Sequence, residues 1–129
     1  MKIAISSTGQ KPESDIDPRF GRCKYFLVVD TDTREFEAFL NENAEAMGGA
    51  GIKAAQFVAD LNVKAILTGN IGPNAFETLN AAGIEILTGV EATVNDAVED
   101  YKEGKLKRAQ AFTVESHSGM GQGRQRGRQ

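Results

Sequence analysis

The sequence predicts an α/β fold with one mixed sheet of five strands and three helices. Three observations predict it. The chain has 129 residues, which is the size of one ordinary domain, and its 40% hydrophobic content is enough for a single core. The apolar pattern is that of strands over the first third of the chain, and that of helices alternating with short strands after it.

The first third contains three predicted strands. Residues 2–6 alternate, residues 24–30 form a continuous apolar run, and residues 35–40 alternate again after the turn TDTR, which predicts a hairpin. Residues 7–22, between the first two strands, are rich in Ser, Gly, Pro and Asp. We expect this long loop to be functional, because long loops in compact domains often are.

Two helices and a short buried strand follow the irregular stretch NENAEAMGGAG. Apolar residues on one helical face predict a helix over about residues 51–61, and residues 64–68 then form a strand. Pro73 is suited to a first helical position, so a second helix should start there, run through Leu79 and stop near Gly83.

The last strand covers residues 84–88 and leads into a third helix. The spacing of Thr88 and Glu91 is that of a capping box, which predicts that the helix begins there. Gly104 should end it. Its apolar face consists of Val90, Val94, Val98 and Tyr101.

The predicted order is therefore β-β-β-α-β-α-β-α. Because parallel crossovers are right-handed, strands one to three should form an antiparallel meander, with strands four and five parallel to strand one on its other side. The spatial order is then 3-2-1-4-5, the arrangement of ribonuclease-H-like folds. We expect residues 1–115 to form this single domain and residues 116–129, which are rich in Gly, Gln and Arg, to form a disordered tail.

Five segments should meet at the edge of the sheet where strands one, four and five end. They are the 7–22 loop, Cys23, MGGAG (47–51), GNIG (69–72) and TGV (88–90). All three helices would begin there, each with unpaired N–H groups and about half a positive charge, which suits an anion with many acceptor atoms. The alternative is that these glycines only form tight turns. The candidate contact residues are Phe20, Gly21, Gly48, Gly49, Gly51, Gly69, Asn70, Gly72 and Gly89.

Two arginines lie in the same region. Arg19 and Arg22 flank the Phe-Gly pair and can neutralise an anion. The alternative is a surface pairing with Asp15 or Asp17.

Cys23 is the only cysteine, so it cannot form an internal disulfide, and we expect a cytoplasmic protein. Near arginines and helix starts its thiolate would be favoured, and a soft thiolate selects iron–sulfur species or copper(I). The alternative is an inert core cysteine. His117 and Met120 can add soft ligands from the tail, although a lone histidine in such a tail is more often solvated.

Composition and motifs argue against several classes of protein. The net charge is −3 although the tail holds three arginines and no acid, so the rest of the chain is acidic and nucleic-acid binding through the fold is not expected. No apolar run approaches the length of a membrane span. A two-metal nuclease needs carboxylates on the central strands, but residues 2–6 and 64–68 contain none. Phosphate-binding loops and nucleophile elbows are also absent, which favours a binding module over an enzyme.

Four stretches carry a resemblance to a known family: DPRFGRCKYFLVVD, MGGAGIKAAQFV, AILTGNIGPNAFETL and GIEILTGVEATVNDAVEDYKEGKL. Over roughly residues 1–108 the chain resembles the dinitrogenase iron–molybdenum cofactor biosynthesis family, which includes NifX, NafY and the C-terminal domain of NifB. The resemblance implies a ribonuclease-H-like fold without nuclease residues. It also implies binding of iron–sulfur or iron–molybdenum cofactor precursors, which are carried between cluster-donor and acceptor proteins.

The positions that match the family are the Arg19–Gly21 stretch, the Gly48–Gly51 loop and the Gly69–Gly72 turn. NifX-like carriers often have a histidine just before the Phe-Gly pair, where this chain has Arg19. Cys23, close by, can serve as the soft ligand instead, which favours a simple iron–sulfur species.

The expectation is thus a non-catalytic carrier or scaffold for an anionic cluster, held by backbone N–H groups and ligated by Cys23. One thiol is fewer than the four that usually hold a cluster, so the site would be open, shared across a homodimer, or completed by small thiols. The alternative is a regulatory or interaction domain that binds a partner protein or a phosphorylated small molecule at the same edge.

Overall fold

The computed structural model of the protein describes residues 1–114. It has the predicted order of elements, and their limits agree with the predicted ones except at the start of the last helix. The predicted tail, with His117 and Met120, lies outside the described residues. The elements are β1 (Lys2–Ser7), β2 (Tyr25–Asp30), β3 (Phe36–Leu40), α1 (Ala50–Ala59), β4 (Ala65–Leu67), α2 (Pro73–Ala81), β5 (Glu85–Leu87) and α3 (Val94–Lys102).

The sheet has the strand order β3-β2-β1-β4-β5, which confirms the predicted topology. β1 pairs antiparallel with β2, and β2 with β3, whereas β4 runs parallel to β1 and β5 parallel to β4. The carboxyl ends of β1, β4 and β5 therefore lie at one edge of the sheet, and β2 begins at that edge. The loops that follow these three strands are brought together there.

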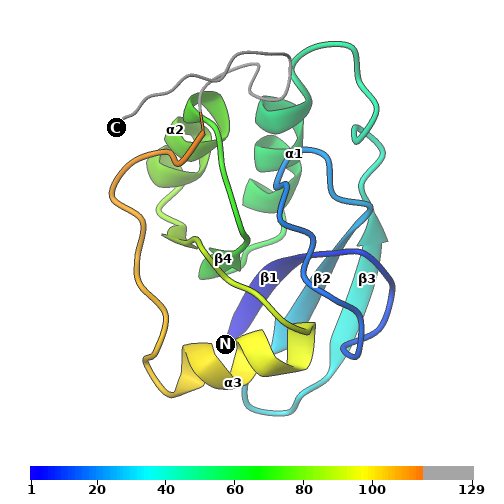
Figure 1. The fold of residues 1–129 in the computed structure, drawn as a ribbon, viewed down its shortest axis with the longest axis vertical. Helices are drawn as coiled ribbons and strands as arrows, with labels where there is room; N and C mark the ends of the chain where they lie inside the picture. The colour runs from blue at the N-terminus through cyan, green and yellow to red at the C-terminus, as the bar shows by residue number, and fades with distance from the viewer. Residues whose placement is uncertain (115–129) are drawn as a thin grey trace.

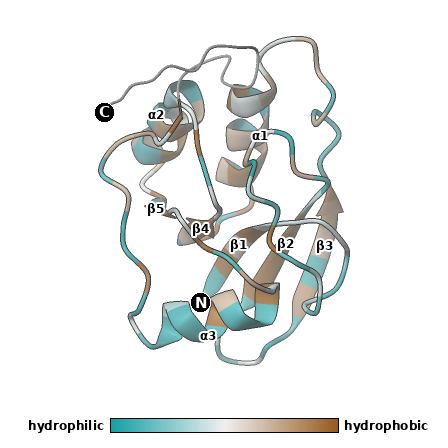
Figure 2. Cartoon of the chain, viewed as in Figure 1, coloured by the Kyte–Doolittle hydropathy of each residue, from teal (hydrophilic) through white to brown (hydrophobic). Residues whose placement is uncertain are grey.

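Two layers of apolar side chains lie on opposite faces of the sheet. On one face α1 and α2 pack over a cluster that includes Phe26 and Leu79, and on the other face α3 packs over a cluster that includes Leu27 and Val94. The neighbours Phe26 and Leu27 point to opposite faces because strand side chains alternate. Figure 1 shows α1 and α2 next to one another and α3 apart from them, and Figure 2 shows the hydrophobic colour concentrated on the strands between them.

The third helix begins later than the capping-box spacing predicts. α3 starts at Val94, and the side chain of Thr93 accepts a hydrogen bond from the N–H of Asp96 at 3.1 Å. Thr88 is therefore not the cap, and that prediction is wrong. The physical reason is that the chain must first cross from β5 to the other face of the sheet, where the C=O of Ala92 accepts from the N–H of Ile16 at 2.9 Å.

The residues after α3 return along the outer edge of β5. Leu87 forms a bridge with Arg108, and the N–H of Ala109 donates to the C=O of Ile86 at 2.7 Å. Further on, the N–H of Thr113 donates to the C=O of Ile71 at 2.8 Å, just before α2 begins. The described chain thus ends beside the start of α2. Within residues 1–114, no helix is long and apolar enough to cross a membrane.

Candidate functional site

The Arg19–Phe20 stretch lies directly against the turn between β4 and α2. The N–H of Phe20 donates to the C=O of Asn70 at 3.2 Å, and the N–H of Asn70 donates to the C=O of Pro18 at 2.8 Å. A Cβ atom on Gly69 would lie 2.7 Å from Pro18 Cα, a distance that real side chains do not reach. Gly69 is therefore required for this close approach of two segments far apart in the sequence.

A second close approach joins the same stretch to the start of α1. A Cβ atom on Gly21 would lie 2.9 Å from Gly51 Cα, and one on Gly51 would lie 3.7 Å from the Cβ of Ala75. Gly51 is in the first turn of α1 and Ala75 in the first turn of α2. The two helices therefore begin side by side, with Gly21 packed against one of them. We call residues 19–22, 48–52 and 69–75 the rim.

Neither helix start in the rim has a side-chain cap. α1 is preceded by Gly49, which has a φ of 73°, and α2 is preceded by Gly72. The N–H groups of Lys53 and Phe76 are the ones that donate back to these two glycines. The N–H groups that precede these two in the first turn of each helix have no protein acceptor within residues 1–114. Each helix start also carries a partial positive charge. These N–H groups belong to Ala50, Gly51, Ile52, Asn74 and Ala75.

The start of α3 differs, which corrects the prediction of three open helix starts. The N–H of Val94 donates to the C=O of Ser14 and that of Asn95 to the C=O of Pro12, both at 2.9 Å. Asp96 donates to Thr93, as described above. Residues 12–14, which pass over this helix end, occupy two of the three groups and Thr93 occupies the third, so the first turn of α3 offers no free donors to a ligand.

The remaining predicted glycines have different surroundings. Gly89 lies next to the rim, but its N–H donates to the C=O of Gly69 at 2.8 Å, so it supports the turn. A Cβ atom on Gly48 would meet nothing within 4 Å, and the neighbouring Met47 is fully exposed. The segment just before α1 is thus open to solvent.

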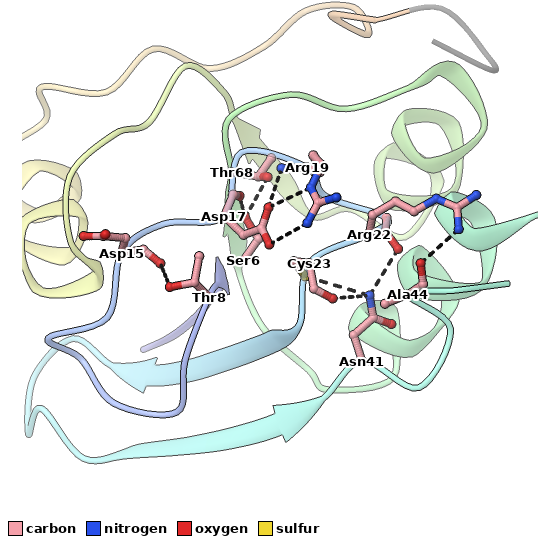
Figure 3. Close-up of polar contacts among 11 residues, drawn as sticks. Ser6, Thr8, Asp15, Asp17, Arg19, Arg22, Cys23, Asn41, Ala44 and Thr68 are labelled. Carbon is pink, nitrogen blue, oxygen red and sulfur yellow. Dashed lines mark hydrogen bonds and ion pairs between the residues drawn. The ribbon is translucent and has the colours of Figure 1, made fainter. Parts of the chain in front are cut away.

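The two arginines are held in different ways, as Figure 3 shows. Arg19, which is exposed, pairs with the buried Asp17 at 3.3 Å, and Asp17 is one of the two partners weighed as alternatives to an anion contact. One guanidinium nitrogen of Arg22 donates to the C=O groups of Ala44 and Ala46 at 2.9 and 2.8 Å. Within the described residues Arg22 has no carboxylate partner, so the rim carries its uncompensated positive charge.

Cys23 lies beneath the rim and is not part of its surface. Its side chain is 0% exposed and belongs to the core cluster under α1 and α2. Burial, followed by the negative charge of Asp17, raises the pKa of the Cys23 thiol to about 12. The prediction that its thiolate is favoured is therefore wrong, because the nearby helix starts face solvent while the sulfur faces the core.

Sequence reasoning missed the polar residues that support the rim from below. The amide nitrogen of Asn41, a buried residue, donates to the C=O groups of Gly21 at 3.1 Å and Cys23 at 2.9 Å. Its Oδ1 accepts from the N–H of Asn43, which is a typical local turn. The signal was the asparagine that directly follows the strand at residues 35–40, just where that strand ends.

A buried polar cluster under the turn before Asn70 was also missed. Ser6 Oγ is 2.7 Å from the C=O of Asp17 and 2.8 Å from the Oγ1 of Thr68, and all three residues are buried. Ser6 is the second-last residue of β1 and Thr68 directly follows β4, so hydroxyl groups near the ends of apolar strands were the available signal.

The described residues do not form a site of side-chain metal ligands. Within residues 1–114, no three His, Cys, Asp or Glu side chains come together in a way that could hold a metal ion. A cavity of about 430 Å³ lies at the other end of the sheet, where Met1, Glu85, Tyr101 and Leu106 are among its lining residues. The rim is therefore a surface of backbone donors and positive charge, which is the kind of surface that favours an anion.

Comparisons with known proteins agree with this architecture. The chain is similar to the orange protein from Desulfovibrio gigas, whose apo form has been solved, with a TM-score of 0.85, 37% identity, and coverage of 88% of this chain and 96% of that one. It is also similar to a Thermotoga protein of the DUF35 family proposed to be a NifB protein, with a TM-score of 0.76, 35% identity, and coverage of 88% and 97%.

A sequence relative is an uncharacterized protein from Methanocaldococcus jannaschii, which is 30% identical over 111 residues, 84% of this chain and 91% of the relative. The family model described as dinitrogenase iron-molybdenum cofactor matches residues 1–104. The chain therefore belongs to the dinitrogenase iron–molybdenum cofactor family.

Proposed function

We propose that this protein is a non-catalytic carrier or scaffold that binds an anionic iron–sulfur or iron–molybdenum cofactor precursor at the rim. The observation that carries the proposal is the pair of uncapped helix starts, α1 and α2, which begin side by side. Their unpaired N–H groups and partial positive charges favour an anion with several acceptor atoms, and the sulfides of a cluster are such acceptors.

Arg22 adds to this preference from the side. Its guanidinium is exposed, and it holds the segment before α1 through Ala44 and Ala46 while its charge remains uncompensated within the described residues. In the proposed complex it lowers the free energy of a bound anion and keeps the start of α1 in place. Arg19 contributes less, because Asp17 already neutralises its charge.

The cluster in this proposal is held by hydrogen bonds and charge, without a covalent bond to Cys23. The buried thiol and the absence of a metal-ligand group within residues 1–114 both support this version of the site. Iron ligands then come from the sulfides of the cluster or from small thiols. Weak attachment suits a carrier, which must accept its load from a donor protein and release it to an acceptor protein.

The test is anaerobic reconstitution of the full chain with iron and sulfide, followed by metal and sulfide analysis. The informative variant is Asn74→Asp, which places a negative charge in the first turn of α2, where it favours the helix but repels an anion. Asn80→Asp is the matched control, because Asn80 is an exposed asparagine at the opposite end of the same helix. Cys23→Ala tests the thiol.

We expect the wild type, Asn80→Asp and Cys23→Ala to bind iron and sulfide alike, and Asn74→Asp to bind about tenfold more weakly, which is the size of one repulsive charge interaction in a partly exposed site. Loss of binding in Cys23→Ala with retained stability would show that the thiol is a ligand after all. If the wild type takes up neither iron nor sulfide, the cluster proposal fails.

The second candidate is a domain that binds a phosphorylated small molecule or a partner protein at the rim. It is favoured by the same donors, because phosphate also binds at helix starts and needs no soft ligand. Titration with inorganic phosphate, followed by NMR, separates the two. Amide shifts at Gly51 and Gly72 in a protein without iron affinity would favour this candidate.

A further inference from the structure

The two edge strands of the sheet, β5 and β3, differ in whether another segment covers their outer side. The outer side of β5 is covered by the bridge between Leu87 and Arg108 and by the N–H of Ala109. Among residues 1–114 no segment pairs with the outer side of β3, which is the strand at the opposite edge of the sheet (Figure 1). One edge is therefore covered within the molecule and the other is open.

The ladder between β2 and β3 fixes which backbone groups point outward. The N–H of Asn41 donates to the C=O of Lys24 at 2.9 Å, so Asn41 is directed toward β2. Direction alternates along an antiparallel ladder, so Phe39 and Glu37 are also directed toward β2. The N–H and C=O groups of Phe36, Ala38 and Leu40 then point outward.

The same three residues form an apolar stripe on one face of β3. They pair with Val29, Leu27 and Tyr25 of β2. Phe36 is 46% exposed and Leu40 is 54% exposed, whereas large apolar side chains at an isolated edge are usually avoided. The strand FEAFL also contains neither lysine nor proline, the residues that most commonly protect an edge from pairing, and Glu37 is its one charged residue.

We propose that β3 pairs antiparallel with β3 of a second copy of this chain, with Ala38 opposite the partner's Ala38. This is the register in which all five residues of the strand are paired, and it joins the outward-pointing groups of both copies. Phe36 then faces the partner's Leu40, and Glu37 faces the partner's Phe39, so no two acidic side chains are opposed.

The pairing has a consequence for the rim. β3 runs toward the edge of the sheet that carries the rim, because Asn41 follows it and contacts Gly21. Antiparallel pairing turns the second copy around, so the two rims lie at opposite ends of one continuous sheet. A cluster shared between the two rims is incompatible with this dimer, and each copy binds its own ligand. The inference does not depend on what the rim binds.

The interface is short, so we expect a weak and reversible dimer. Five paired residues on each side bury less than the area of standard stable interfaces, which points to a dissociation constant of about 100 µM. Sedimentation equilibrium of the full chain across that concentration measures it. Hydrogen exchange at the same concentrations reports whether the amides of Phe36, Ala38 and Leu40 become protected.

The disruptive variant is Phe36→Lys with Leu40→Lys, which puts charges on the outer stripe. Phe112→Lys is the matched control, because Phe112 is also exposed, at 41%, but lies after α3. If the double variant fails to fold by circular dichroism, Leu40→Lys alone replaces it, because that side chain is already more than half exposed.

We expect dimerisation of the wild type and of Phe112→Lys, at least tenfold weaker association of the edge variant, and concentration-dependent protection of the three amides. A wild type that stays monomeric up to about 1 mM would overturn the proposal, since that concentration exceeds the expected constant tenfold. A dimer that the edge variant leaves intact would also overturn it. Protection of the same amides in a monomer would show that another part of the chain covers β3.

Discussion

The starts of α1 and α2 contrast with the start of α3, although all three helices follow strands that end at the same edge of the sheet. In α1 and α2 the first-turn N–H groups have no acceptor within residues 1–114. In α3 every one of them is used, two by the backbone of residues 12–14 and one by Thr93. A helix start can therefore offer N–H donors to a ligand only where the surrounding loops leave those donors free.

The difference follows from where the long loop after β1 runs. It first passes over the face that α3 covers, where it satisfies that helix, and then crosses to the other face at Pro18, where it contacts Asn70 and Gly51 through backbone atoms. On the second face it packs beside the helix starts without occupying their donors. One loop therefore closes one helix end and leaves two others open.

A reactive Cys23 thiol beside the open starts of α1 and α2 would contradict this contrast most strongly. With a pKa raised from 9.0 to about 12, Cys23 should be labelled by a disulfide reagent at pH 8 about a thousandfold more slowly than in the unfolded chain, because that is the ratio of thiolate fractions. The rate of labelling in native buffer and in denaturant measures this. Comparable rates in the two conditions would place an accessible thiol beside the rim.

The close approach that shapes the rim should be sensitive to a single methyl group. Gly69→Ala puts a Cβ atom 2.7 Å from Pro18, so we expect a loss of about 3 kcal/mol in the free energy of unfolding, the upper range for overpacked sites, together with weaker ligand binding. Gly48→Ala, whose Cβ atom meets nothing, is the control and should be neutral. Denaturant titration compares them, and equal stability of both variants would mean that the two segments are not packed together.

Alkaline pH should weaken the fold through the same buried thiol. The thiol pKa is raised in the folded state, so the unfolded chain loses this proton first. Stability is therefore unaffected below pH 9 and falls as pH rises from 9 toward 12, by about 1.4 kcal/mol per pH unit. Cys23→Ala lacks this contribution, so its free energy of unfolding should fall less steeply than that of the wild type between pH 9 and 10.5. Parallel curves would contradict the burial of the thiol.

A mutation at the closed start of α3 should lower the stability of the protein without changing its ligand binding. Thr93→Ala removes the side-chain acceptor for Asp96 at the start of α3, so we expect a loss of about 1 kcal/mol in the free energy of unfolding. Uptake of iron and sulfide by this variant should equal that of the wild type. Weaker uptake in a folded Thr93→Ala protein would show that the α3 end contributes to the site.

The fold was predictable because its determinants are local. The alternating residues of β1, the apolar run of β2 and the proline at the start of α2 each set one element, and right-handed crossovers then leave few ways to order the strands. The start of α3 was misplaced because two threonines, Thr88 and Thr93, both precede an acid three residues later. Only the path of the chain across the sheet decides between them.

The site was predictable as a set of segments but not in its chemistry. Topology alone brings Gly21, Gly51 and Gly69 to one edge, as predicted. Which N–H groups remain unpaired depends on long-range backbone contacts such as that of Val94 with Ser14, and the sequence carries no sign of these. The burial of Cys23 likewise depends on packing beneath the helix starts, which a position along the chain does not reveal.

The most direct test of the central claim is an amide NMR spectrum of the full chain before and after anaerobic loading with iron and sulfide. We predict that the signals of residues 50–52 and 74–75 shift or broaden, while those of residues 94–96 at the start of α3 do not change. Equal perturbation of all three helix starts, or perturbation confined to α3, would contradict the distinction between open and closed helix ends.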